Sequence, residues 1–95
     1  MANRPLNRIA AEITVEWTNQ IRHTNRKPAY MVHAWPYLEA MLWMDDIAKP
    51  YGLEEGVFVV LYFLNNATPW RGEVARRIKA ELNQQVKEYN AAHSR

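Results

Sequence analysis

Apolar residues recur every three or four positions along the first part of the chain. The series begins just after Pro5 and consists of Leu6, Ile9, Ala10, Ile13, Trp17 and Ile21. This spacing places the side chains on one face of an amphipathic α-helix. Proline suits the first turn of a helix, and the residue before Pro28 is biased away from helical backbone. The pattern predicts a helix over residues 5–23.

A second periodic series lies in the C-terminal part of the chain, at Val74, Ile78, Leu82, Val86 and Tyr89. Thr68 is a favourable N-cap residue, and Pro69 suits the first helical position. These signals predict a helix over residues 68–89, followed by a frayed tail at residues 90–95. Charged residues four positions apart predict ion pairs within this helix, namely Glu73 with Arg77 and Arg77 with Glu81.

Two shorter elements are predicted between these helices. The Trp35-Pro36 step marks a helix start, and apolar residues with helical spacing follow it, so a helix is predicted over residues 36–48. The preceding residues, 24–35, are interpreted as a linker or a short extra turn. Residues 54–66 form the other element, which carries Glu54 and Glu55 where a first helical turn favours acidic side chains.

The segment from 57 to 64 is apolar on every side, so periodicity does not separate a buried helix from a buried strand. Its Val, Phe and Tyr content favours a strand, whereas the lack of a convincing partner strand favours a helix. A helix without a polar face is typical of a central position covered by neighbours. We therefore predict an all-α, compact four-helix domain over residues 1–95 with a central apolar third helix, and the strand stays as the alternative for 57–64.

Composition narrows the functional classes mainly by exclusion. The chain has 95 residues, of which 48% are hydrophobic, and this content is too high for a disordered protein. It has no cysteine, which excludes disulfides, thiol nucleophiles and cysteine-based zinc sites. The longest uncharged apolar run, 57–64, is too short to span a membrane, and the charged N-terminal residues do not fit a signal peptide. We expect a soluble cytoplasmic protein.

The residue types that carry catalysis or bind metals are not grouped in the sequence. His23, His33 and His93 are far apart, and Ser94 is the only serine. Asp45 and Asp46 are neighbours, which point about 100° apart on a helix and do not converge on one ion. The three glycines form no phosphate-binding loop. We therefore expect no enzymatic activity, no metal and no cofactor.

Aromatic and basic residues are the better candidates for function. Trp70 and Arg71 are adjacent and belong to the types most enriched in interface hot spots. Gly72 follows them, and a glycine in a first helical turn predicts that another element packs closely against it. Arg76 and Lys79, with Asn83 and Lys87, lie on one weakly basic helix face. The predicted partner-binding residues are Trp70, Arg71, Arg76, Lys79, Trp35 and Tyr37.

Three segments resemble a family of short proteins of unknown function from actinobacterial phages and related mobile elements. They are WPYLEAM (35–41), YG (51–52) and VLYFLNNATPWRGEVARRIKAEL (60–82), and together they cover about half of the chain. The most distinctive part is the WRGE core at residues 70–73. The resemblance carries no known activity, but it implies a small phage protein made in the cytoplasm of a bacterial host.

The function expected from these observations is that of a non-enzymatic, phage-type interaction protein. It would bind a host or phage protein through an aromatic and arginine surface. One alternative is a small nucleic-acid-binding regulator, and a second is an oligomer that sequesters a small anionic nucleotide. Self-association into a homo-oligomer is compatible with each of these, and no membrane partner is expected.

Overall fold

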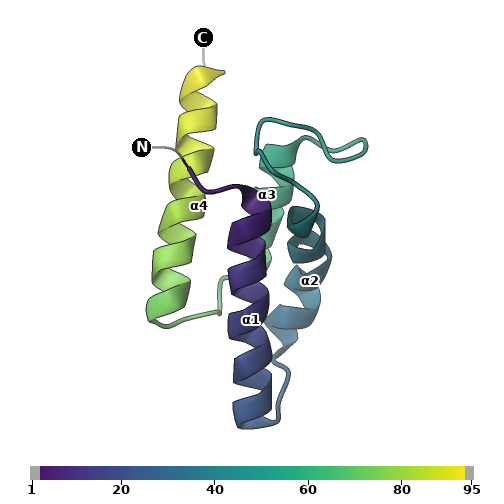
Figure 1. Cartoon of the computed structure of the whole chain (residues 1–95), viewed down its shortest axis with the longest axis vertical. Helices are drawn as coiled ribbons and strands as arrows, with labels where there is room; N and C mark the ends of the chain where they lie inside the picture. The colour runs from purple at the N-terminus through teal and green to yellow at the C-terminus, as the bar shows by residue number, and fades with distance from the viewer. Residues whose placement is uncertain (1–2, 94–95) are drawn as a thin grey trace.

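The computed structural model describes residues 3–93, which form four α-helices and no β-strand. The helices are α1 (Leu6–Thr24), α2 (Ala29–Leu42), α3 (Gly56–Asn66) and α4 (Glu73–Ala92), and they run alternately down and up along the longest axis of the molecule (Figure 1). The predicted all-α four-helix domain is confirmed, and 57–64 is a helix rather than a strand. Residues 1–2 and 94–95 lie outside the described range.

An aromatic cluster ties the elements together in the core. The ring of Trp17 on α1 stacks on Phe63 of α3 at 5.8 Å between centroids. It also meets Tyr30 of α2 edge-on at 5.6 Å and Trp70, in the segment between α3 and α4, at 5.4 Å. Such edge-to-face and stacked pairs add to the gain from apolar burial. Trp17 therefore contacts side chains of α2, α3 and the segment between α3 and α4.

The predicted start of the second helix at Pro36 is wrong. α2 begins at Ala29, directly after Pro28, and Pro36 lies inside it. Thus residues 29–35, predicted as a linker or short turn, form the first half of α2. The buried residues Met31, Ala34, Leu38 and Met41 follow helical spacing through the proline. Burial of this continuous apolar stripe outweighs the backbone hydrogen bond that Pro36 does not donate.

The second helix also ends earlier than the predicted residue 48. α2 stops at Leu42, and residues 43–55 form a loop at the end of the molecule where α2 ends and α3 begins (Figure 1). Met44 and Ile47 from this loop are buried, whereas Trp43 and Leu53 are exposed. The loop therefore closes one end of the core with part of its apolar side chains and presents the others to solvent.

The fourth helix begins at Glu73, so the predicted N-cap at Thr68 and helix start at Pro69 are wrong. The Thr68 hydroxyl instead donates to the carbonyl of Asn65 at 2.8 Å, at the C-terminal end of α3. Gly72 is the residue before α4, and its φ of 117° is a conformation that side chains with a Cβ rarely adopt. A Cβ at Gly72 would meet nothing within 4 Å, so the predicted close packing there is also wrong. At its other end α4 includes residues 90–92, which were predicted to fray.

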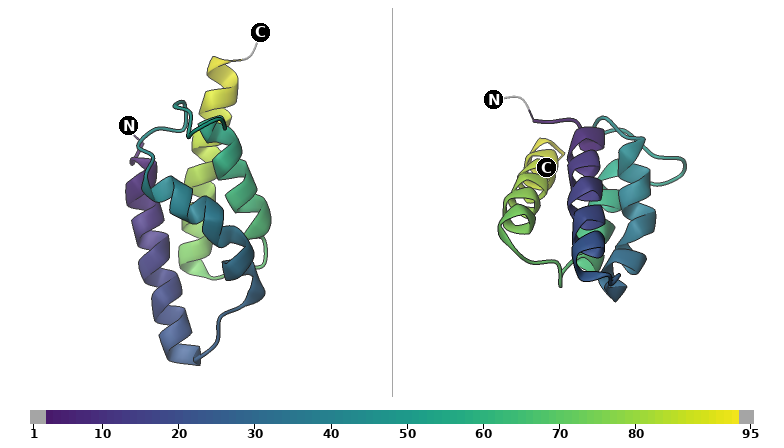
Figure 2. Two further views of the ribbon diagram at one scale, coloured as in Figure 1. Left: turned by 90° about the vertical axis from the view of Figure 1, so that its right-hand side faces the viewer. Right: turned by 60° about the horizontal axis from the view of Figure 1, so that its bottom comes forward.

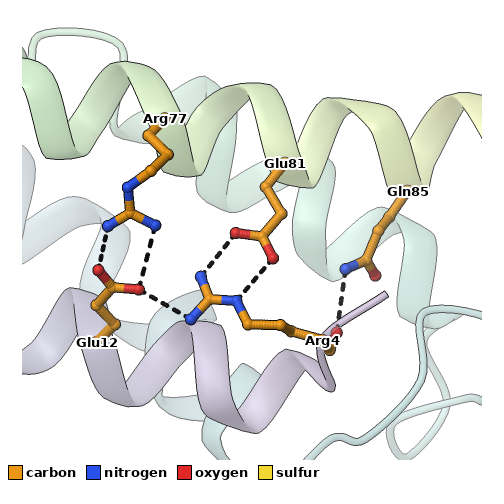
Figure 3. A network of polar contacts seen from close by, with 5 residues as sticks. All are labelled: Arg4, Glu12, Arg77, Glu81 and Gln85. Atoms are coloured by element: carbon orange, nitrogen blue, oxygen red, sulfur yellow. Dashed lines mark hydrogen bonds and ion pairs between the residues drawn. The ribbon is translucent and has the colours of Figure 1, made fainter. Parts of the chain in front are cut away.

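Charged residues join α1, α4 and the N-terminal segment (Figure 3). The predicted pairs of Arg77 with Glu73 and Glu81 are replaced by contacts between elements: Arg77 pairs with Glu12 of α1. Glu81 instead accepts two hydrogen bonds from Arg4. Arg4 also pairs with Glu12 at 2.9 Å. The polar faces of the two longest helices are thus connected through alternating charges.

None of the helices within residues 3–93 has the length and apolar content needed to cross a membrane.

Candidate functional site

Trp70, predicted as a partner-binding residue, is part of the core. Its side chain is 1% exposed and meets the Trp17 ring at an interplanar angle of 88°. Its indole N–H, like that of Trp17, has no hydrogen-bond acceptor among the residues that the structure describes. The assignment of Trp70 as a surface anchor is therefore wrong. Trp70 holds the α3–α4 linker, residues 67–72, against the bundle.

The neighbouring cations form a second feature, which we call the basic corner: Arg71, Arg76 and Lys79. They line an open depression of about 360 Å³ where α4 begins. Arg71 and Arg76 are exposed, and within residues 3–93 no ion pair involves any of the three side chains. Trp70 lines the same depression, so the structure places together four of the six residues that the sequence predicted.

Lys79 differs from the two arginines because its side chain contacts the backbone of the α3–α4 linker. Its ammonium group donates to the carbonyl of Trp70 at 2.5 Å and to that of Thr68 at 3.2 Å. It also lies 5.9 Å from the centre of the Trp70 ring. Burial lowers the pKa of Lys79, and the nearby positive charge of Arg71 lowers it further. Lys79 therefore supports the linker as well as contributing charge to the corner.

Trp35, another predicted partner residue, lies in a different place. It is 40% exposed and borders a small, largely apolar groove of about 190 Å³ between α1 and α2. The groove is also lined by Trp17, Ile21, Met31 and Leu38, with Lys27 at its edge. Trp35 is thus separated from the basic corner, and the six predicted residues do not form one site.

Tyr37, the last predicted residue, is half-buried and lies at the edge of a patch that we call the aromatic face: Tyr37, Phe58, Leu61 and Tyr62. The Tyr62 ring lies 5.4 Å from the Tyr37 ring across the α2–α3 contact and 6.3 Å from the Phe58 ring on its own helix. Phe58, Leu61 and Tyr62 are 40%, 36% and 41% exposed. Figure 2, left, views the molecule from the side on which α2 and α3 lie in front.

The sequence prediction missed the three α3 members of this face. They lie at i, i+3 and i+4, which is one side of a helix. The opposite side, with Val59, Val60 and Phe63, is equally apolar and is buried. Hydrophobicity alone therefore does not distinguish the two sides. The prediction of a third helix covered by its neighbours is correct for the side that packs on α2 and α4, whereas the aromatic face remains exposed.

The distribution of charge sets α2 and α3 apart from the other helices. Among the 25 residues of these two helices, Glu39 is the only Asp, Glu, Lys or Arg. α4 alone contains seven such residues. Scattered apolar side chains are normal on protein surfaces, but a contiguous aromatic patch on helices with a single charged residue is typical of an interface core.

The side chains that could bind metals are dispersed. Across residues 3–93, no group of three His, Asp or Glu side chains is close enough to hold a metal ion. His23 and His33 are exposed on α1 and α2, and the His93 ring stacks on Tyr89 at 4.0 Å. The arrangement therefore offers surfaces for binding, namely the aromatic face and the basic corner.

Comparisons with known proteins return no match to a family model, a curated protein or a solved structure. The resemblance to small phage proteins therefore stays a prediction from the sequence. A function for this chain is argued from its own surfaces.

Proposed function

We propose that this chain is a small non-enzymatic interaction protein that binds another protein through the aromatic face. The observation that carries the proposal is the exposure of Phe58, Leu61 and Tyr62 on a helix without a charged residue. Tyr37 extends the same surface onto α2. The phage resemblance supplies the setting, in which the partner is a host or phage protein in the bacterial cytoplasm.

The chemistry of the aromatic face suits a protein partner. Aromatic side chains bring a large contact area for few rotatable bonds, and the tyrosine hydroxyls can donate hydrogen bonds at the rim. The rings of Tyr37 and Phe58 flank that of Tyr62, so its position is partly set before any partner binds. Such preorganisation lowers the entropic cost of association. Nucleic acid is a less suitable partner for this face, because α3 has no Lys or Arg to pair with a phosphate group.

The test is affinity capture from a bacterial lysate with a pair of matched variants. The double variant Phe58→Ser/Tyr62→Ser removes the centre of the aromatic face. The control, Val15→Ser/Val32→Ser, removes two valines that are 60% and 53% exposed elsewhere on α1 and α2. Val32 lies five residues before Tyr37 and thus about 140° around α2 from it. We expect one captured protein to be lost with the first variant and kept with the control.

Circular dichroism and thermal melting show whether each variant remains folded. A partner that binds wild type and both folded double variants equally would overturn the assignment to the aromatic face. Equal loss of the partner with both folded variants would also contradict it, because the effect would not depend on the face.

The basic corner supports a second candidate function, binding of nucleic-acid or nucleotide phosphate. Three cations surround one depression at the start of α4, where backbone N–H groups favour anions. The Arg71→Gln/Arg76→Gln variant should weaken binding of a fluorescent DNA duplex, and Lys87→Gln farther along α4 should change it little. Binding by wild type should also fall steeply as salt is raised. Salt-independent binding, or no binding at low salt, would remove this candidate.

A further inference from the structure

Charge is distributed unequally between the two ends of α2 and α3. Residues 43–55, between the end of α2 and the start of α3, expose Asp45, Asp46, Glu54 and Glu55 against a single cation, Lys49. Lys49 is paired with Asp45 at 3.2 Å, which leaves Asp46 and the two glutamates in excess. This end of the α2–α3 layer is acidic.

The opposite end of the same two helices is basic. Arg26 and Lys27 are exposed in the linker before α2, and Arg71 is exposed in the linker after α3. Both linkers lie toward the lower end of the molecule in Figure 1, away from the loop that contains Glu54 and Glu55. Between the two charged ends lies the uncharged aromatic face.

We propose that the protein bound at the aromatic face is a second copy of this chain, packed antiparallel against α3 about a twofold axis. The proposal rests on the proposed function, because it uses the same surface and adds a second copy of the chain to the proteins that this surface binds. In an isologous dimer each copy uses the same patch, so the patch must be complementary to itself. An antiparallel arrangement brings Glu54 and Glu55 of each copy toward Arg71 and Arg26 of the partner.

The charges select this arrangement among those that would bury the same rings. A parallel packing of the two α3 helices would bring acidic end to acidic end and basic end to basic end, which opposes association. The antiparallel packing forms two favourable contacts of opposite charge at the rim and places the uncharged rings at the centre. An apolar centre with a charged rim is the usual anatomy of a protein interface.

The geometry of α3 fits such a contact. Its 11 residues span about 16 Å, so a crossing near Leu61 and Tyr62 leaves both charged ends within reach of the partner copy. On the exposed side of α3, Phe58 lies near the acidic end and Asn65, also exposed, near the basic end. Phe58 of each copy would therefore lie close to Asn65 of the other, and Leu61 near the twofold axis.

Sedimentation equilibrium on the full chain tests the proposal with two charge-reversal variants. Variant one is Glu54→Lys/Glu55→Lys, and variant two is Arg26→Glu/Arg71→Glu. Each alone should raise the dimer dissociation constant at least about tenfold, because like charges then meet at both rims. An equimolar mixture of the two should form heterodimers. At one rim of the heterodimer both sets of charges are reversed and at the other rim neither is, so opposite charges meet at both.

Two controls separate this geometry from other kinds of association. Arg8→Glu/Lys87→Glu reverses two exposed cations on α1 and α4 and should leave the dissociation constant within about twofold of wild type. Phe58→Ser/Tyr62→Ser should abolish the dimer, which ties it to the aromatic face. A wild-type chain that remains monomeric up to about 1 mM overturns the inference.

A dimer that is unaffected by both charge reversals, or a mixture that fails to recover, also overturns the inference. These failures differ from failure of the proposed function. If wild type is monomeric but loses a lysate partner with Phe58→Ser/Tyr62→Ser, the aromatic face binds a foreign protein and only the inference falls. If the dimer responds as expected while no foreign protein depends on the face, self-association stands and the host or phage partner is excluded.

Discussion

Arg4 and Glu81, which are 77 positions apart, form a two-point ion pair between the N-terminal segment and α4. The Arg4 Nε lies 2.7 Å from one carboxylate oxygen of Glu81, and Nη2 lies 2.6 Å from the other. The side chains are 37% and 25% exposed, so solvent screens the pair only in part. Gln85 adds a hydrogen bond of 3.1 Å from its amide to the Arg4 carbonyl. This contact fixes where the chain enters α1.

The first prediction concerns this ion pair. A double-mutant cycle with Arg4→Met and Glu81→Gln should give a coupling energy of about 1 kcal/mol, because a bidentate pair loses less entropy than a flexible surface pair. Urea unfolding of the four proteins provides the measurement. The coupling should shrink in 1 M salt, where the screening length is about 3 Å. A coupling energy indistinguishable from zero at low salt would show that the two side chains act independently.

The second prediction concerns the dependence of stability on pH. Hydrogen bonding from Arg77, together with Arg4, holds the pKa of Glu12 below its ordinary value near 4.5. As the pH falls, the Glu12 carboxylate is therefore protonated at a higher pH in the unfolded chain than in the folded protein. The contribution of Glu12 is fully present above pH 4.5 and is lost as the pH falls through the folded-state pKa.

Urea unfolding between pH 7 and pH 3 should show this loss as a steeper fall in the free energy of unfolding for wild type than for Glu12→Gln. Glu39→Gln is the control, because Glu39 is exposed on α2 outside the charge network. Parallel curves for wild type and Glu12→Gln would contradict the assigned role of Glu12.

The third prediction is that Trp70 acts on stability. Trp70→Ala should lower the free energy of unfolding by about 3–5 kcal/mol, because it removes a buried ring from the contact with Trp17. Trp70→Phe should cost less, since it keeps an aromatic ring and removes an indole N–H that has no acceptor within the described residues. Thermal melting distinguishes the variants. A Trp70→Ala protein as stable as wild type would mean that the tryptophan does not hold the linker.

The fourth prediction uses two glycines with different constraints. A Cβ at Gly56 would lie 2.6 Å from the carbonyl oxygen of Ile47, and closer still to that of Lys49, so the 43–55 loop would have to shift. Gly56→Ala should destabilise the protein by about 1–3 kcal/mol. Gly52, with φ of 62°, has open space around it, and asparagine tolerates that conformation.

Gly52→Asn should therefore change the free energy of unfolding by less than Gly56→Ala does, in parallel urea titrations. If the order of the two variants were reversed, the loop would not pack on the start of α3 as described.

Recognition of the elements from the sequence succeeded where the relevant forces are local. The apolar spacing of α1 and α4 and the acidic residues before α3 act within a few turns of one helix, so a linear pattern contains them. The helix boundaries failed where packing competes with local signals. Pro36 is tolerated inside α2 because Met31, Ala34, Leu38 and Met41 all reach the core. Thr68 lies just after α3, and its hydroxyl donates to the carbonyl of Asn65 instead of capping α4.

The candidate site was predictable only in part. Clustering of Arg71, Arg76 and Lys79 followed from their nearness in sequence, whereas Tyr37, predicted as a partner-binding residue, is half-buried against the core. The burial of Trp70 depends on Trp17, which is far away in the chain. The aromatic face depends on which side of an all-apolar helix meets its neighbours.

The sequence by itself predicted the four elements within residues 3–93 and excluded cysteine chemistry, because composition and helical periodicity are properties of the chain. It left a strand open for residues 57–64. The tertiary structure decided the direction of each large aromatic side chain and the partner of each charged one. Those choices depend on long-range packing, which brings Trp17 to Trp70 and Arg4 to Glu81. The same packing covers one apolar side of α3 and leaves Phe58, Leu61 and Tyr62 on the other side exposed.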